Sequence, residues 1–234
     1  MLFIIDFDGT VAPTDTVDAL LDRFAASEWR RVEAEWVAGR ISSRDCMAAQ
    51  IALVTGDRVS LEEFFHSVAI DPSFPAFARY VSSSAEMAIV SDGLDYPIEH
   101  ALKGIDTPPI PVYANKLGLR PAGLDISFPF SDASCVVNNG VCKCAVARSI
   151  DAGRKLAIVL IGDGRSDYCL ARSADYVFAK GSLQRLCEEE HINHSPFATF
   201  QDVLTVIQGW EPQRQSTSHL RRRHVIRRGS SRQG

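Results

Sequence analysis

The chain has 234 residues, a length that allows one core domain with a smaller insert. With 46% hydrophobic and 23% charged residues, its composition is that of an ordinary globular protein. Its net charge of −4 is uneven, because seven arginines and no acid lie between Pro212 and Gly234 and the remaining residues carry −11. So acidic a body argues against a nucleic-acid partner, and no apolar run is long enough to predict a signal peptide or a membrane span.

The first ten residues combine a buried strand with two acids. Leu2–Ile5 is an apolar run rich in aromatic and β-branched residues, which predicts a strand buried on both faces. Asp6 and Asp8 follow it, and alternation along an extended chain places them on the same side. Two carboxylates at a buried strand end repel each other, so a cation is their natural partner. The alternative is that one acid caps a helix and the other lies in a solvated turn.

A helical insert follows this strand. Helix signals cover about 14–24, 27–39 and 42–54, and Ser60-Leu61-Glu62-Glu63 has the form of a capping box that opens another helix. Thr14 or Asp15 can cap the first of these helices. No strand pattern lies in this part of the chain, so we expect a small helical cap over 13–75.

Strands and helices alternate in the rest of the chain. Strand patterns occur at 87–90, 111–115, 156–161 and 176–179. Helix patterns occur at 95–103, at 143–152, from the end of the stretch 162–167 to about 172, and at 182–190. Residues 117–142 are rich in turn-forming residues and predict a hairpin or a long loop. The alternation predicts an α/β fold, a Rossmann-like parallel sheet with right-handed crossovers, built from residues 1–12 and 76–210.

Polar groups follow three of these strands at the sheet edge where open α/β folds bind ligands. In chain order they are Asp6 with Asp8, Ser91, and Asp163 with Asp167. Lys143 opens a predicted helix between the second and third of these groups. Structural roles alone do not explain the whole set, which therefore predicts an active site.

In order, these residues resemble the four motifs of the haloacid-dehalogenase-like (HAD-like) phosphatases. The resemblance covers about residues 1–190, and a helical insert directly after the first motif is typical of the phosphoserine-phosphatase-like branch. A late stretch from Phe178-Ala179-Lys180 to His194-Ser195-Pro196-Phe197 is similar to the methionine-salvage group of that branch. The motifs are Asp6-Phe7-Asp8-Gly9-Thr10, Ser91, Lys143 and Gly162-Asp163-Gly164-Arg165-Ser166-Asp167.

The resemblance implies hydrolysis of a small phosphomonoester, with Mg²⁺ as cofactor, through an aspartyl-phosphate. It gives Asp6 the role of nucleophile, which divides one difficult hydrolysis into two easier steps. Asp8 would protonate the leaving oxygen and later deprotonate water, a role that requires a raised pKa. Lys143 would offset the negative charge of Asp6 and of the phosphoryl group.

The resemblance also implies a set of ligands. Mg²⁺ would be held by the carboxylates of Asp6 and Asp163 and the backbone carbonyl of Asp8, with Asp167 as a supporting acid. The phosphoryl oxygens would be held by Ser91 and by backbone amides near Thr10, Asp92 and Gly93.

Some residues depart from that branch and bear on the substrate. Asp15 takes the place of a cap-hinge glutamate that contacts substrate, and Arg165-Ser166 replaces Ala-Asn. By rough alignment Gln50 holds the place of an arginine that meets the substrate carboxylate. Without that bidentate partner a neutral or apolar phosphomonoester is favoured over phosphoserine. The alternatives are phosphoserine or another alcohol phosphate and, from another class, a catalytically silent protein that binds a phosphate ligand.

Three further features favour ordinary structural roles. Cys135, Cys142 and Cys144 lack a common zinc spacing, so small buried thiols are favoured over a metal site. The six cysteines of a chain without a signal peptide favour a cytoplasmic location. Trp29, Trp36 and Phe24 recur at helical spacing and predict a miniature core in the insert, and residues 211–234 predict a disordered basic tail.

Overall fold

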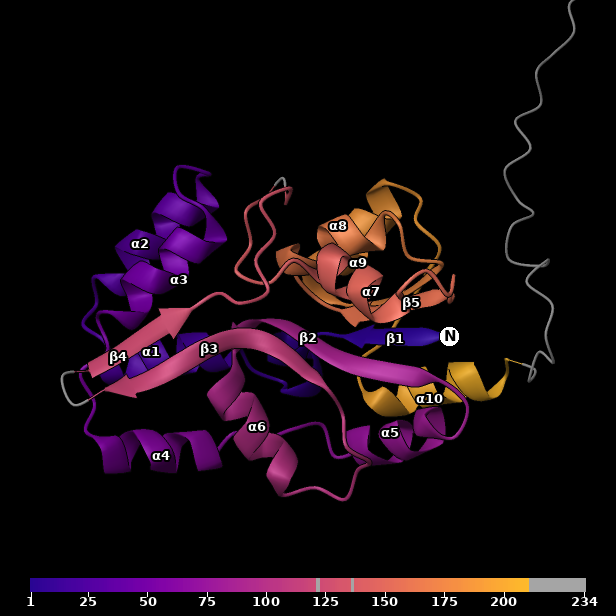
Figure 1. Ribbon diagram of the computed structural model, residues 1–234, viewed down its shortest axis with the longest axis horizontal. Coiled ribbons are helices and arrows are strands. Elements are labelled where there is room, and N and C mark those ends of the chain that lie inside the picture. The colour runs from indigo at the N-terminus through magenta and orange to yellow at the C-terminus, as the bar shows by residue number, and fades with distance from the viewer. Residues whose placement is uncertain (121–122, 136, 211–234) are drawn as a thin grey trace, which may run out of the picture.

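A computed structural model describes residues 1–120, 123–135 and 137–210 of the chain (Figure 1). Within these residues seven strands form one sheet in the order β4-β3-β2-β1-β5-β6-β7, and all neighbours are parallel except β3 and β4. The α/β fold with a largely parallel sheet is thus confirmed. The predicted tail over 211–234 lies outside the described residues. None of the described helices combines the length and the apolar character that a membrane span requires.

Strand β1 (Leu2–Ile5) lies at the centre, between β2 and β5. The predicted strands are confirmed, and the predicted hairpin is formed by β3 and β4. The short edge strand β7 was missed by the sequence prediction. The bounds of the other strands are β2 (Glu86–Leu94), β3 (Val112–Arg120), β4 (Gly123–Ser127), β5 (Ile158–Gly162), β6 (Tyr176–Ala179) and β7 (His194–Pro196).

The sheet separates two hydrophobic cores, because successive side chains of β1 point to opposite faces. Phe3 and Ile5 pack in the core that is covered by α5 (Phe74–Ser82), α6 (Asp95–Lys103) and α10 (Phe200–Gln208). Leu2 and Ile4 pack on the other side, against α7 (Lys143–Asp151), α8 (Tyr168–Ala171) and α9 (Gly181–Glu189). Figure 1 shows these two helix layers above and below the sheet. Burial on both faces explains why the central strands are continuous apolar runs.

Helices α5 and α10 were missed by the sequence prediction, although α10 carries a signal. Its buried residues recur at helical spacing, and Thr199 and Asp202 form a capping box at its start. The two helices pack together, with the rings of Phe74 and Phe200 4.9 Å apart. Asp71 links their beginnings, because its carboxylate accepts hydrogen bonds from the backbone N–H of both Ser73 (2.7 Å) and Phe200 (2.7 Å).

Four helices form the predicted helical stretch: α1 (Thr16–Phe24), α2 (Trp29–Val37), α3 (Ser43–Ile51) and α4 (Arg58–His66). They share a third core, to which the β3–β4 hairpin adds Leu117 and Ile126. The predicted helix start at Ser60 is wrong, since α4 begins at Arg58 and the Asp57 carboxylate accepts from the Ser60 N–H (3.0 Å). An aspartate at the N-cap competes successfully with a serine three residues later. The domain boundaries at 12/13 and 75/76 stay predictions.

Candidate active site

The end of β1 directs Asp6 and the following turn toward the end of β5. Asp6 is only 5% exposed, and the wide turn Phe7–Val11 comes directly after it. Gly9 has a φ of 67°, and a Cβ at this position would overlap the Asp163 carboxylate. Glycine is therefore required twice, for the backbone conformation and for the close approach. The turn brings the first and last predicted motifs into contact.

Lys143 lies at the first position of α7 and joins these motifs by charge. Its Nζ is 2.9 Å from Asp6 Oδ2, forms a second ion pair with Asp167, and donates to Ser166 Oγ (3.0 Å). Burial disfavours the charge of Lys143, which is 2% exposed, but the carboxylates of Asp167 and Asp6 outweigh this and raise its pKa above the usual range. The ammonium group therefore stays charged beside Asp6.

Three carboxylates offer oxygens within 4.8 Å of one another, those of Asp6, Asp163 and Asp167. Burial raises the pKa of Asp6, and the charges of Asp167 and Asp163 raise it further, although Lys143 acts in the opposite direction. Burial and Asp167 likewise raise the pKa of Asp163 to about 6. One ammonium group does not compensate for so many acids, and hard oxygen donors are the ligands that Mg²⁺ prefers. The residues present therefore fit a divalent cation, and no other such group occurs within the described ranges.

Asp8 is held by the first turn of α1. Its Oδ1 accepts hydrogen bonds from the backbone N–H (2.8 Å) and the hydroxyl (2.5 Å) of Thr16. Burial and the nearby charge of Asp15 raise the pKa of Asp8 to about 7, against the opposing effect of the Thr16 donors. A carboxyl group with this pKa can both give and take a proton near neutral pH. Sequence reasoning missed Thr16, because a threonine at a helix start is usually only a cap residue.

The predicted phosphate-binding residues lie around Asp8 and Asp163. Ser91 is 1% exposed, accepts from the Gly93 N–H (3.0 Å), and lies 3.5 Å from Asp8 Oδ2. A Cβ at Gly93 would overlap Asp8, so close approach again requires glycine. The Thr10 hydroxyl donates to Asp163 Oδ1 (3.2 Å).

The strand predicted over 87–90, with Ser91-Asp92-Gly93 at its end, is longer in the structure. Strand β2 continues through Ser91 to Leu94, and its pairing with β3 shifts register between Val90 and Leu94. The strand therefore extends beyond β1, whose own end lies at Ile5. Ser91 still lies beside the end of β1, so its position at the candidate site is unchanged.

Three further residues named in the sequence analysis, Asp15, Gln50 and Asp92, form hydrogen bonds with other protein groups. The Asp15 carboxylate accepts from the N–H groups of Val17 (2.9 Å) and Asp18 (3.0 Å), so it caps α1, and its substrate contact stays a prediction. Gln50 is 4% exposed and donates to Glu33 Oε2 (2.9 Å) within the helical stretch. Asp92 uses its carboxylate to contact that stretch and the loop before Lys143.

The aromatic and cysteine predictions have mixed outcomes. Trp29 is buried and Phe24 packs against the same core, as predicted, whereas the Trp36 ring lies 5.7 Å below the guanidinium of Arg165. All six cysteines are free, and of the clustered ones Cys142 is buried while Cys135 and Cys144 are half-buried. Burial raises the pKa of the Cys144 thiol to about 11, as expected for an inert thiol.

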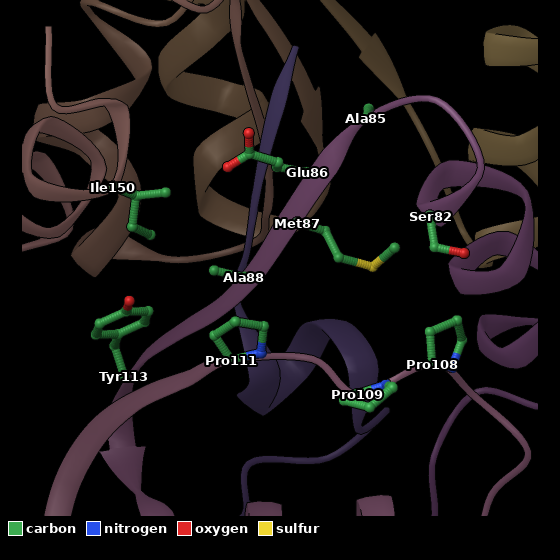
Figure 2. A pocket seen from close by; sticks show the side chains of 10 residues that line it. All are labelled: Ser82, Ala85, Glu86, Met87, Ala88, Pro108, Pro109, Pro111, Tyr113 and Ile150. Carbon is green, nitrogen blue, oxygen red and sulfur yellow. The ribbon is translucent and has the colours of Figure 1, made fainter. Parts of the chain in front are cut away.

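A separate groove of about 260 Å³ lies beside the beginning of β2, at Glu86 and Met87 (Figure 2). Met87, Pro109, Pro111 and Tyr113 line it, with Glu86 and Ile150 on one side. Ser91 lies at the opposite end of the same strand. The groove is thus distinct from the acid cluster.

The chain is similar to known proteins over most of its length. Residues 3–172 match the family model of the haloacid dehalogenase-like hydrolases. A 2-hydroxy-3-keto-5-methylthiopentenyl-1-phosphate phosphatase from Brevibacillus brevis is 31% identical over 212 residues, which cover 89% of this chain and 95% of the relative. A protein of the same name from an Exiguobacterium species is 31% identical, with 88% and 96% covered.

Solved structures share the fold at lower identity. A substrate-bound phosphoserine phosphatase has a TM-score of 0.64 and 17% identity, over 88% of this chain and 97% of the other. A phospho-aspartyl intermediate analogue of phosphoserine phosphatase has a TM-score of 0.65 and 18% identity, with the same coverage.

Proposed function

This chain belongs to the haloacid dehalogenase-like hydrolase family and is a phosphatase, and we propose that Asp6 is its nucleophile. In this proposal an Asp6 carboxylate oxygen attacks the phosphorus of a small phosphomonoester, and the bond between phosphorus and the leaving oxygen breaks. The observation that carries it is the buried Asp6 with Lys143 Nζ at 2.9 Å, at the end of the central strand. A buried ammonium group beside the carboxylate offsets the charge that gathers as two anions meet.

Asp8 is proposed as the general acid and base. It would give its proton to the leaving oxygen in the first step, which yields the free alcohol and an aspartyl-phosphate on Asp6. In the second step water attacks the phosphorus, Asp8 takes a proton from that water, and Asp6 and inorganic phosphate are released. The raised pKa of Asp8 and its firm contact with Thr16 support both roles.

The carboxylates of Asp6 and Asp163 and the Asp8 carbonyl are proposed to hold Mg²⁺, with Asp167 in support. The bound ion would reduce the repulsion between Asp6 and the phosphoryl oxygens. Asp167 has a clear part in this arrangement, because its Oδ2 accepts from the backbone N–H of Asp163 (3.2 Å) and of Gly164 (3.1 Å) and so orients the turn after β5. Ser91 and backbone amides near Thr10, Asp92 and Gly93 are proposed to hold the phosphoryl oxygens.

For the substrate we propose 2-hydroxy-3-keto-5-methylthiopentenyl-1-phosphate, the compound in the names of the similar phosphatases. A similar phosphomonoester with no charged group besides its phosphate is the wider class. The helices opposite the acid cluster support this choice. Gln50 is buried and donates to Glu33 Oε2 (2.9 Å), so this position offers a neutral amide already bonded to an acid. A substrate carboxylate at this position would lose its water without gaining a cationic partner.

We further propose that the enzyme works in the cytoplasm on a small metabolite without a macromolecular partner. Six free cysteines fit a reducing compartment. The direct test of function is turnover of p-nitrophenyl phosphate with and without Mg²⁺, followed by a panel of phosphomonoesters that includes the keto phosphate and phosphoserine. Absence of turnover on every substrate would favour a silent phosphate-binding protein instead.

A further inference from the structure

One side chain at the candidate site connects the helical stretch to the sheet. Ser43 opens α3, and its hydroxyl donates to Asp92 Oδ2 (2.7 Å). Asp92 lies in β2 between Ser91 and Gly93, the residues proposed to hold the phosphoryl group. A hydrogen bond from a hydroxyl to an ionised carboxylate is stronger than a hydrogen bond between two neutral groups. This contact therefore joins a helix above the site to the phosphate-binding part of β2.

The other oxygen of the same carboxylate contacts a different segment. Asp92 Oδ1 accepts from the backbone N–H of Val141 (2.8 Å), two residues before Lys143. The backbone carbonyl of Asp92 is held as well, because Asn115 Nδ2 in β3 donates to it (2.6 Å). Asp92 is thus bonded to three separate segments: α3, the loop that leads to Lys143, and β3.

A second contact between the helices and the sheet lies on the other side of Asp6. Arg165 follows β5, and its guanidinium lies over the Trp36 ring of α2. The sheet order places β2 and β5 on the two sides of β1. The contacts Ser43–Asp92 and Trp36–Arg165 therefore flank Asp6. In the first of them, Asp92 itself is bonded to the segment that leads to Lys143.

We propose that Asp92 is a positioning residue, which couples the seating of α3 over the substrate to the placement of Lys143 and of the phosphate-binding turn. When α3 is seated, the Ser43 hydroxyl and the Val141 N–H both hold the one carboxylate. When α3 moves away, Asp92 loses a donor, and the strand end and the Lys143 loop that it connects become less restrained. The inference rests on the proposed active site but concerns its assembly, not its chemistry.

The experiment compares Ser43→Ala, Ser43→Thr and Asp92→Ala with the wild type on the best substrate of the panel. Ser43→Ala should raise KM and lower kcat/KM about 10-fold, the size of one lost hydrogen bond to a charged group, while Ser43→Thr keeps the hydroxyl and stays within about twofold. Asp92→Ala should also lower kcat, because the Lys143 loop loses its bond. Ser60→Ala is the matched control, since that hydroxyl bonds to Asp57 in its own helix start (2.7 Å).

Two further measurements separate coupling from simple damage. In the double variant of Ser43→Ala and Asp92→Ala, kcat/KM should equal that of Asp92→Ala alone, because the serine acts only through the aspartate. Amide hydrogen exchange should be faster at Val141 in Asp92→Ala and unchanged there in Ser60→Ala. The proposal would be overturned if the losses in kcat/KM of the two single variants multiplied in the double variant. It would also be overturned if Ser43→Ala had the same kcat/KM as Ser60→Ala.

The outcomes also distinguish this proposal from the proposed function. If the wild type turns over no phosphomonoester, the function fails, and amide exchange still tests whether Asp92 restrains Val141. If Asp92→Ala does not fold, Ser43→Ala against Ser43→Thr decides the matter, because both replace one partly buried residue at the start of α3.

Discussion

The two sides of the candidate site are built in different ways. On the sheet side Lys143 is bonded to Asp6 and Asp167, and all three are at least nine-tenths buried. On the helix side Ser43 and Trp36 are only half-buried, and Ser43 has one hydrogen bond to Asp92. Gln50 is buried, but its amide is bonded to Glu33 within the helices. A buried charge network tolerates few changes, because removal of one partner leaves another charge unpaired. The comparison supports our proposal that the sheet side carries the chemistry and the helix side the choice of substrate.

Removal of the proposed cation should cause the largest loss of activity. The carboxylates that would bind it lie on the sheet side, where the proposed chemistry occurs. EDTA should reduce hydrolysis of every substrate to background, and Mg²⁺ should restore it. Ca²⁺ should restore it poorly, because it prefers more ligands in a looser geometry. Mg²⁺ should also raise the thermal midpoint, since it binds the carboxylates of the folded state. Full activity after exhaustive chelation would contradict a metal-dependent mechanism.

Substitution of the proposed nucleophile, Asp6, tests the sheet side by the exchange of one carboxylate oxygen for an amide nitrogen. Asp6→Asn should lower kcat by at least about 10³-fold on all substrates, as expected for a residue that acts in a catalytic unit. The variant should stay folded, because Lys143 keeps its ion pair with Asp167 and one of several neighbouring negative charges is removed. Asp106→Asn is the control, since the Asp106 side chain is 97% exposed. More than a tenth of wild-type turnover in Asp6→Asn would rule out this nucleophile.

Substrate choice tests the helix side. We expect the keto phosphate to have a kcat/KM at least about 10²-fold above that of phosphoserine, the penalty expected when a substrate charge finds no partner. Gln50→Arg should raise kcat/KM for phosphoserine and so reduce the difference between the two substrates. The variant supplies a guanidinium in place of the amide that now bonds to Glu33. The measurement is kcat/KM for both substrates at saturating Mg²⁺. If phosphoserine is the equal or better substrate, another cationic group such as Arg44 of α3 or Arg165 reaches its carboxylate, and the alignment of Gln50 with the substrate-binding arginine is wrong.

The difference between the two sides also explains what could be predicted from the sequence. Strands buried on both faces are continuous apolar runs, so β1 and β5 were evident, and acids after them were expected to meet. The acids do meet, because oxygens of Asp6, Asp163 and Asp167 lie within 4.8 Å of one another and Lys143 is bonded to both Asp6 and Asp167. Short edge strands such as β7, which contains His194 and Pro196, have no such signal.

Contacts that depend on the packing of distant segments were beyond the reach of sequence patterns. The bond between Ser166 and Lys143 joins residues far apart in the chain, and the bond between Ser43 and Asp92 joins α3 to β2. Neither has a characteristic spacing. Trp36 recurs at the same helical spacing as residues of the core, and only the approach of Arg165 distinguishes it from them.

The smallest expected effect lies where the two sides meet, at Thr16, which belongs to α1 and holds Asp8. Thr16→Val keeps the shape and the backbone donor but removes the hydroxyl that donates to Asp8 Oδ1. A donor stabilises the ionised carboxylate, so its loss should raise the pKa of Asp8 further. In the proposed mechanism Asp8 must be ionised to accept a proton from water in the second step. The variant should therefore need a higher pH to reach its maximal kcat.

At neutral pH we expect kcat of Thr16→Val to fall about 10-fold, the cost of one hydrogen bond to a charged group. Thr16→Ser keeps the hydroxyl and should retain the wild-type pH profile, which makes it the matched control. The measurement is kcat against pH for the three enzymes at saturating Mg²⁺ and substrate. A Thr16→Val enzyme with an unchanged profile would mean that the Thr16 hydroxyl does not affect the acidity of Asp8. At this contact the helix side would then act on Asp8 only through the backbone N–H of Thr16.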